Sequence, residues 1–245
     1  MSTLQSTLTG PVIAVAADLL SDTSTQFHAL GAYVETADGR GYRYCKAGGT
    51  SLVAGKLQQS AAQDATNQNP SGGLAVAAAA IGATSVTLTG SLTLTANVLA
   101  GGYMSVAVTP GQGYTYRVLG NTAVSGAANC VVTLADPLVI ALTTSSKVTF
   151  STHPYSNVIV NPTTATGAPV GVANSIITNA QYGWLQTRGV CSVLTDSGTT
   201  VGLGVAPSAA VAGAVKTAAT TLCTVGFAVE TCVTTEYDLV FLTIG

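Results

Sequence analysis

The residues that could do chemistry are few in this sequence, and they lie far apart. His28 and His153 are its two histidines, so a Ser-His-Asp hydrolase would have to use one of them as its base. Spacing suggests a partner for neither one. The ten Asp and Glu residues form no D-x-D or H-x-E pattern, so the usual spacing of metal ligands is missing. We therefore expect a non-enzymatic protein with no metal and no cofactor.

Two glycine-rich stretches resemble nucleotide-binding loops but depart from the required spacing. In "GGTSLVAGKL" (48–57), Gly49 and Gly55 enclose five residues, whereas a phosphate-binding loop has four. Its lysine is also followed by Leu57 instead of Ser or Thr. "GQGYTY" (111–116) lacks the third glycine of a dinucleotide fingerprint. We therefore expect no nucleotide binding at either place, and a tight turn at 111–116. A polysaccharide hydrolase is the alternative from the enzyme class, and it would need two carboxylates flanking a cleft.

The cysteines indicate neither a disulfide framework nor a zinc site. Their number is odd and their spacing is wide: Cys45, Cys130, Cys191, Cys223 and Cys232. The amino terminus has no positive charge ahead of its short apolar patch, so we expect no secretory signal and synthesis in a reducing cytoplasm. In that compartment the cysteines would serve as small buried hydrophobic residues.

Charge is unusually scarce. Charged residues make up 7% of the chain, against about 25% in an ordinary soluble domain. No charge occurs before Asp18 or between Asp64 and Arg117. Scattered single Lys and Arg residues disfavour binding to nucleic acid or to an anionic membrane. Neutral surfaces suit contact with other protein, because burying an unpaired charge is costly.

Strict alternation of Thr and aliphatic residues predicts strands. In "SVTLTGSLTLT" (85–95) the apolar residues Val86, Leu88, Leu92 and Leu94 are even-numbered and the Thr residues are odd-numbered. Two arrangements keep one apolar face: a hairpin with the loop 89–91, or one long strand through the glycine. In the last strand, 237–244, both parities are apolar, which predicts burial on both faces.

The whole pattern predicts a mainly β protein of two to three small barrel or sandwich modules, with one short helix within 48–68. A hairpin at 31–49, turning at Asp38-Gly39, would place Tyr33 opposite Tyr44. The predicted organisation is an extended N-terminal arm (1–29), the hairpin plus short helix (30–69), a β-rich barrel or sandwich (70–160), a linker or crossing loop (161–175) and a C-terminal β domain (176–245).

Four segments together suggest a family. They are "GRGYRYCKAGGTSLVAGKLQQ" (39–59), "GGYMSVAVTPGQGYTYRVLGNTA" (101–123), "LADPLVIALTTSSKVTFSTHPYSNVIV" (134–160) and "TGAPVGVANSIITNAQYGWLQTRGVCSVLTDSG" (166–198). In style and order they resemble capsid decoration (cement) proteins and related head proteins of tailed bacteriophages. The resemblance implies a virion protein, made in the host cytoplasm, that binds the outside of the capsid and bridges neighbouring major capsid subunits. It also implies self-association, commonly as a homotrimer.

Interface residues are expected in two places. The first is the uncharged arm, with Leu4, Leu8, Val12 and Ile13, which we expect to lie along a neighbouring subunit. The second is Trp184 with Tyr182, either as an interface anchor or, for Trp184, as a core residue. The alternative function is a receptor-binding module of a phage tail or fibre, although a long fibre should show a repeating shaft and this chain shows none.

Overall fold

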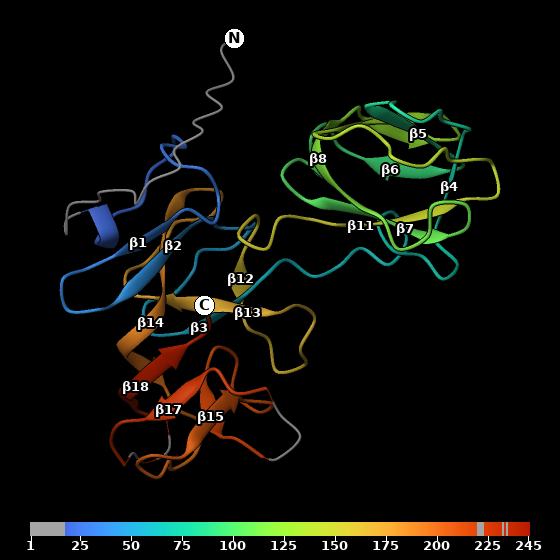
Figure 1. Cartoon of the computed structure of the whole chain (residues 1–245). Helices are drawn as coiled ribbons and strands as arrows, with labels where there is room; N and C mark the ends of the chain where they lie inside the picture. Colours follow the sequence, from blue (N-terminus) through green and yellow to red (C-terminus); the bar gives the residue numbers. More distant parts are fainter. Residues whose placement is uncertain (1–17, 220–222, 232, 234) are drawn as a thin grey trace. The chain divides into compact units, whose positions relative to one another are not determined.

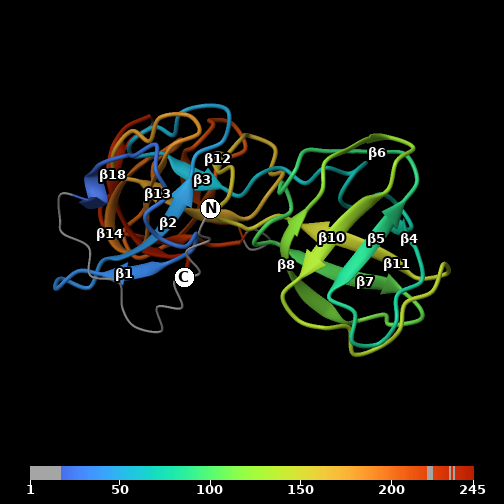
Figure 2. The ribbon, with the colours of Figure 1, turned by 90° about the horizontal axis from the view of Figure 1, so that it is seen from above.

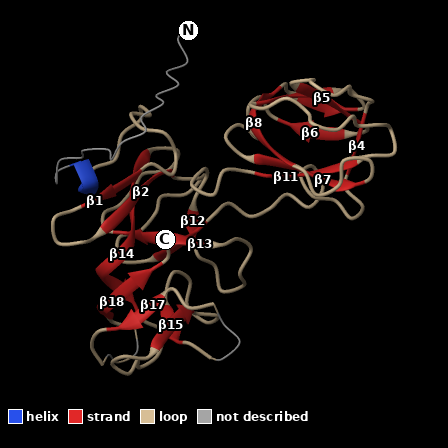
Figure 3. Ribbon diagram, viewed as in Figure 1, coloured by secondary structure: helices blue, strands red, loops and turns tan. Residues whose placement is uncertain are grey.

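The computed structural model describes residues 18–219, 223–231, 233 and 235–245. Over these residues the chain consists of short strands and turns, with one 3-10 helical turn, η1 (Asp18–Leu20) (Figure 3). The predicted mainly β class with barrel-like modules is therefore confirmed. Thr, Val and Leu in alternation favour this outcome, because they fit a pleated surface with one buried face.

Two compact units make up the structure, and Figure 1 draws both. Unit 2 is Ala62–His153, close to the module predicted at 70–160. Unit 1 combines the chain before Ala62 with Pro154–Gly245. The chain thus leaves unit 1, forms unit 2 and returns.

Unit 2 is a closed barrel. Its strands follow one another around the barrel in the order β10, β5, β4, β11, β7 and β8, which Figure 2 shows from above. The core contains Leu88, Met104, Val132 and Phe150, each almost fully buried. Closure leaves no open strand edge in the barrel, which protects it from edge-to-edge aggregation. The strands are β4 (Leu74–Val76), β5 (Ser85–Thr89), β7 (Tyr103–Val108), β8 (Thr115–Asn121), β10 (Cys130–Leu134) and β11 (Lys147–Ser151).

The alternating stretch 85–95 keeps its apolar face but not its expected partners. Val86, Leu88, Leu92 and Leu94 are all buried, as the parity predicts. Both predicted arrangements are wrong, however, because β5 pairs with β10 and β4 inside the barrel. The next strand, β6 (Leu92–Leu94), leaves the barrel sheet and pairs with β9 (Val124–Gly126). Gly90, with a φ of 113°, allows this change of direction.

Unit 1 is built on a ten-stranded sheet. Eight of its strands follow the order β12-β3-β13-β14-β18-β17-β15-β16, and the other two, β2 and β1, branch from it because β2 pairs with β14 and β1 pairs with β2. Strand β14 organises it, because it pairs with β2, β13 and β18. The strands are β1 (Tyr33–Glu35), β2 (Gly41–Lys46), β3 (Leu57–Gln59), β12 (Ile159–Val160), β13 (Pro169–Ala173), β14 (Tyr182–Leu194), β15 (Gly204–Pro207), β16 (Val215–Thr217), β17 (Gly226–Ala228) and β18 (Tyr237–Thr243).

Three sequence expectations in unit 1 need correction. The helix predicted within 48–68 does not form, because its centre is β3, which pairs with β12 and β13. The stretch predicted as a linker, 161–175, contains β13, a strand of the main sheet. Segments 30–69 and 176–245 do not form separate modules, since β2 pairs with β14. The three corrections share one cause, because pairing between distant segments overrides the local preference for helix or loop.

The hairpin β1–β2 forms where predicted, but its register differs by one residue. Tyr33 lies opposite Arg43 instead of Tyr44. Thr36 pairs with Arg40, so the loop has three residues and not two, and Gly39 adopts a φ of 82° within it. The shift brings the Arg43 guanidinium to 5.4 Å from the centre of the Tyr33 ring.

Candidate functional site

Trp184 and Tyr182, the predicted interface pair, lie in an aromatic cluster of unit 1. Trp184 is 3% exposed, and its ring lies 5.0 Å from that of Tyr44 on the paired strand β2. The His28 ring packs edge-on against Tyr44 and tilted against Trp184, at 5.1 and 5.3 Å between centroids. The structure thus agrees with the core interpretation of Trp184. Tyr182 is only partly buried and stacks on Tyr44, with the Lys46 ammonium over its ring.

The described end of the predicted arm is docked onto its own chain. Thr23 and Tyr182 exchange two backbone hydrogen bonds, of 3.0 and 2.9 Å. The Thr178 backbone N–H donates to the Asp22 carboxylate at 2.7 Å, and hydrogen bonding with Thr178 lowers the pKa of Asp22. For the described part of the predicted arm 1–29, the expectation of a free extended segment is therefore wrong where Asp22 and Thr23 dock. The candidates Leu4, Leu8, Val12 and Ile13 lie outside the described residues.

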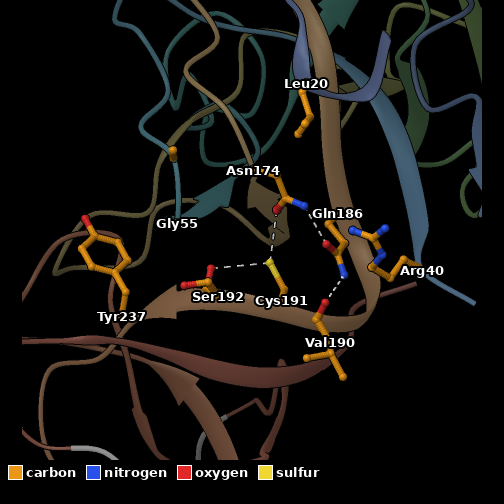
Figure 4. Close-up of a pocket in the computed structure, with 10 residues that line it drawn as sticks. Leu20, Arg40, Gly55, Asn174, Gln186, Val190, Cys191, Ser192 and Tyr237 are labelled. Atoms are coloured by element: carbon orange, nitrogen blue, oxygen red, sulfur yellow. Dashed lines mark hydrogen bonds between the residues drawn. The ribbon is translucent and has the colours of Figure 1, made fainter. Parts of the chain in front are cut away.

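A cavity of about 530 Å³ opens beside β14, and Figure 4 shows its lining. The Cys191 thiol donates to Asn174 Oδ1 at 3.2 Å, and Asn174 Nδ2 donates to Gln186 Oε1 at 2.7 Å. The Gln186 amide in turn donates to the Arg188 and Val190 carbonyls. This network satisfies the fully buried Gln186, which lies at the irregularity in the pairing of β14 with β2.

The cavity lacks the chemistry of a cysteine nucleophile. Burial raises the pKa of the Cys191 thiol to about 12, and the weaker influence of Arg40 opposes that shift. The thiol is therefore protonated at neutral pH. Neither histidine lines the cavity, since His28 belongs to the aromatic cluster and His153 to unit 2. Among the residues that the structure describes, no group of three His, Cys, Asp or Glu side chains could hold a metal ion.

The outer side of β14, β18 and β17 carries a continuous set of exposed apolar side chains. Val190, Phe241 and Phe227 lie directly opposite one another across the three strands. One row further along, Leu239 faces Ser192 and accepts a backbone hydrogen bond from Val229. We call this set the apolar face: Val190, Phe227, Val229, Tyr237, Leu239 and Phe241, each between 39% and 52% exposed.

The apolar face corrects the prediction that 237–244 is buried on both sides. Val240 and Leu242 point into the core of unit 1, together with Val193. Tyr237, Leu239 and Phe241 point the other way and remain exposed. The signal was present in the sequence, because both parities of this strand are apolar. A strand of that kind either is buried on both faces or presents one of them to a partner.

Charged groups flank the apolar face along β18. Arg188 lies opposite Thr243 at one end, beside a cavity of about 550 Å³ that Arg43 and Phe241 also line. At the Leu239 row, the Glu230 carboxylate accepts a hydrogen bond of 2.7 Å from the Leu239 backbone N–H. One end of the face thus carries Arg188, with Arg43 and Glu35 lining the same cavity, and the other end carries Glu230.

Comparisons with known proteins identify no relative of this chain. In the described part of the chain, no helix is long and apolar enough to cross a membrane. The chain matches no family model, no curated protein and no solved structure.

Proposed function

We propose that this chain is a non-enzymatic structural protein of a virion. In this proposal it binds the outer surface of a tailed-phage capsid, after synthesis in the host cytoplasm, and bridges neighbouring major capsid subunits to stabilise the shell. The sequence resemblance to decoration proteins suggests the family. The structural support is that the surface of unit 2 carries few charges and many exposed apolar side chains.

The surface of the barrel is poor in charge and rich in exposed apolar side chains. Over 62–153 the charged residues are Asp64, Arg117, Asp136 and Lys147. Large apolar side chains are exposed on its strands and loops: Ile81, Tyr103, Val108, Tyr114, Leu119, Val131 and Val139. Covering such a surface with another protein removes apolar area from water and buries few charged groups. The free-energy cost of desolvating charges on contact is therefore small. This is the single observation that carries the proposal.

Capsids that lack the protein provide the test. Purified chain is mixed with them, and bound protein is measured by co-sedimentation together with the temperature at which the shells release their DNA. We expect saturation at a ratio compatible with capsid symmetry and a higher release temperature. Binding to host cells with no binding to capsids would favour the tail or fibre receptor-binding module instead.

Surface variants locate the contact. Leu119→Glu and Val131→Glu, on strands β8 and β10 of unit 2, should reduce capsid occupancy at least about tenfold, because each places a charge in an apolar contact. Ile176→Glu, at a similarly exposed position of unit 1, is the matched control and should leave occupancy unchanged. Equal losses in all three variants would mean that the barrel surface is not the contact.

The arm prediction is kept for residues 1–17. Deleting residues 2–17 leaves Asp22 and Thr23 in place, so the docking of 18–29 onto unit 1 is undisturbed. If the arm lies along a neighbouring subunit, the deletion should lower occupancy and heat resistance without changing the fold. Unchanged occupancy would remove the arm from the proposal.

A further inference from the structure

The apolar face of unit 1 is as large as the largest apolar patch on a typical monomer. Its three aromatic side chains are 41% to 52% exposed. With about 150–250 Å² for each aromatic side chain, and less for Val and Leu, the six residues expose roughly 400–500 Å². The largest apolar patch on a monomer is typically about 300–600 Å², and such patches are often functional. A standard interface buries about 800 Å² on each partner, so this face would form its apolar centre.

The core explains why these side chains are outside. The opposite side of the same three strands is already filled by Cys191, Val240, Leu242 and Ala228. Because side chains alternate between the two faces of a strand, the apolar residues at the intervening positions cannot reach that core. They serve packing only if something covers the outer face.

The charges at the two ends of the face indicate what covers it. Arg188 lies at the Thr243 row and Glu230 at the Leu239 row, about 14 Å apart along β18. Phe241 lies in the row midway between them. If the same face of a second copy is turned over by a two-fold rotation near Phe241, Arg188 of each copy meets Glu230 of the other.

We propose that two copies of this chain pack through their apolar faces to form a two-fold symmetric dimer. Phe241 lies near the axis, the other apolar residues surround it, and two Arg188–Glu230 ion pairs close the ends. A two-fold interface uses one self-complementary patch on both subunits, which is what this face provides. A ring of three copies would need two different, mutually complementary patches on each. The dimer therefore replaces the homotrimer expected from the family resemblance, and it does not depend on capsid binding.

The experiment measures the mass of the full chain in solution by sedimentation equilibrium, across protein concentration and without capsids. We expect a mass of twice 24.3 kDa at high concentration. Phe241→Glu places two like charges near the axis and should weaken the dimer at least about tenfold. Ile176→Glu, an equally drastic change at an exposed position of unit 1 outside the apolar face, should leave the dimer intact. Circular dichroism of each variant checks that it is folded.

A charge exchange tests the two-fold pairing itself. Arg188→Glu alone and Glu230→Arg alone should each weaken the dimer, because each brings like charges together. The double variant restores both pairs and should recover most of the affinity. The charge exchange also tests the dimer if the Phe241→Glu variant fails to fold. A monomer at all concentrations, a trimer, a dimer unaffected by Phe241→Glu, or no recovery in the double variant would each overturn the proposal. A monomer that still binds capsids would overturn the dimer and leave the proposed function standing.

Discussion

Replacing Trp184 by Ala separates a core role from an interface role. Trp184 is 3% exposed and packs against Tyr44 and His28. Removing a buried tryptophan side chain costs about 3–5 kcal/mol, which includes the lost transfer free energy and the cavity left behind. Contacts between aromatic rings add about 0.5–1.5 kcal/mol per pair, so we expect the upper part of that range. An interface anchor exposed in the free subunit would cost far less.

The assay uses Cys45 as a reporter of opening in unit 1. Cys45 lies on β2 directly opposite Gly183, is fully buried, and burial raises the pKa of its thiol to about 12. Its alkylation therefore requires unit 1 to open. If opening is fast relative to alkylation, a loss of 3–5 kcal/mol speeds modification by about 150-fold to about 5,000-fold. Mass spectrometry of the peptide containing Cys45 follows the rate.

Ile176→Ala is the control, since Ile176 lies in the same unit and is 63% exposed. It should change the rate at Cys45 by less than about threefold. If Trp184→Ala also stays within threefold of the unchanged chain while assembly is lost, the core assignment is refuted and Trp184 is an interface residue.

Three further results are expected. Burial, with a smaller contribution from Arg117, lowers the pKa of His153 below 6.5, so unit 2 should keep its full stability above pH 6.5 and lose part of it on acidification through that lowered pKa. Thermal melts at pH 7.5 and 5 check this, and His153→Gln should reduce the difference. Asn121→Ala should destabilise unit 2 by about 2–4 kcal/mol in denaturant titrations, because the buried Asn121 amide accepts from the Leu99 N–H and donates to two carbonyls. Exposed Cys223 should react with iodoacetamide in the folded chain well before buried Cys191, as peptide mapping would show.

Local patterns in the sequence were sufficient for the class of structure. Alternation over 85–95 depends only on the geometry of an extended chain, so the buried parity of Leu88 and Leu92 could be predicted without knowing any partner. The hairpin at 31–49 likewise depends on a turn only a few residues long. Even there the predicted register was wrong by one residue. The sequence around Gly39 is equally compatible with a two-residue and a three-residue loop, and the structure has the three-residue loop.

The candidate surfaces depend on information that no local pattern contains. Alternation places Phe241 and Val240 on opposite sides of their strand, but an apolar residue looks the same whether it faces a core or solvent. The sequence therefore could not show that the Val240 side faces the core and the Phe241 side does not. Trp184 became a core residue only because β2, some 140 residues earlier in the chain, pairs with β14. The sequence alone determined that this protein is a charge-poor assembly of strands. The tertiary structure decided which distant segments pair, and therefore which of its many apolar side chains remain exposed.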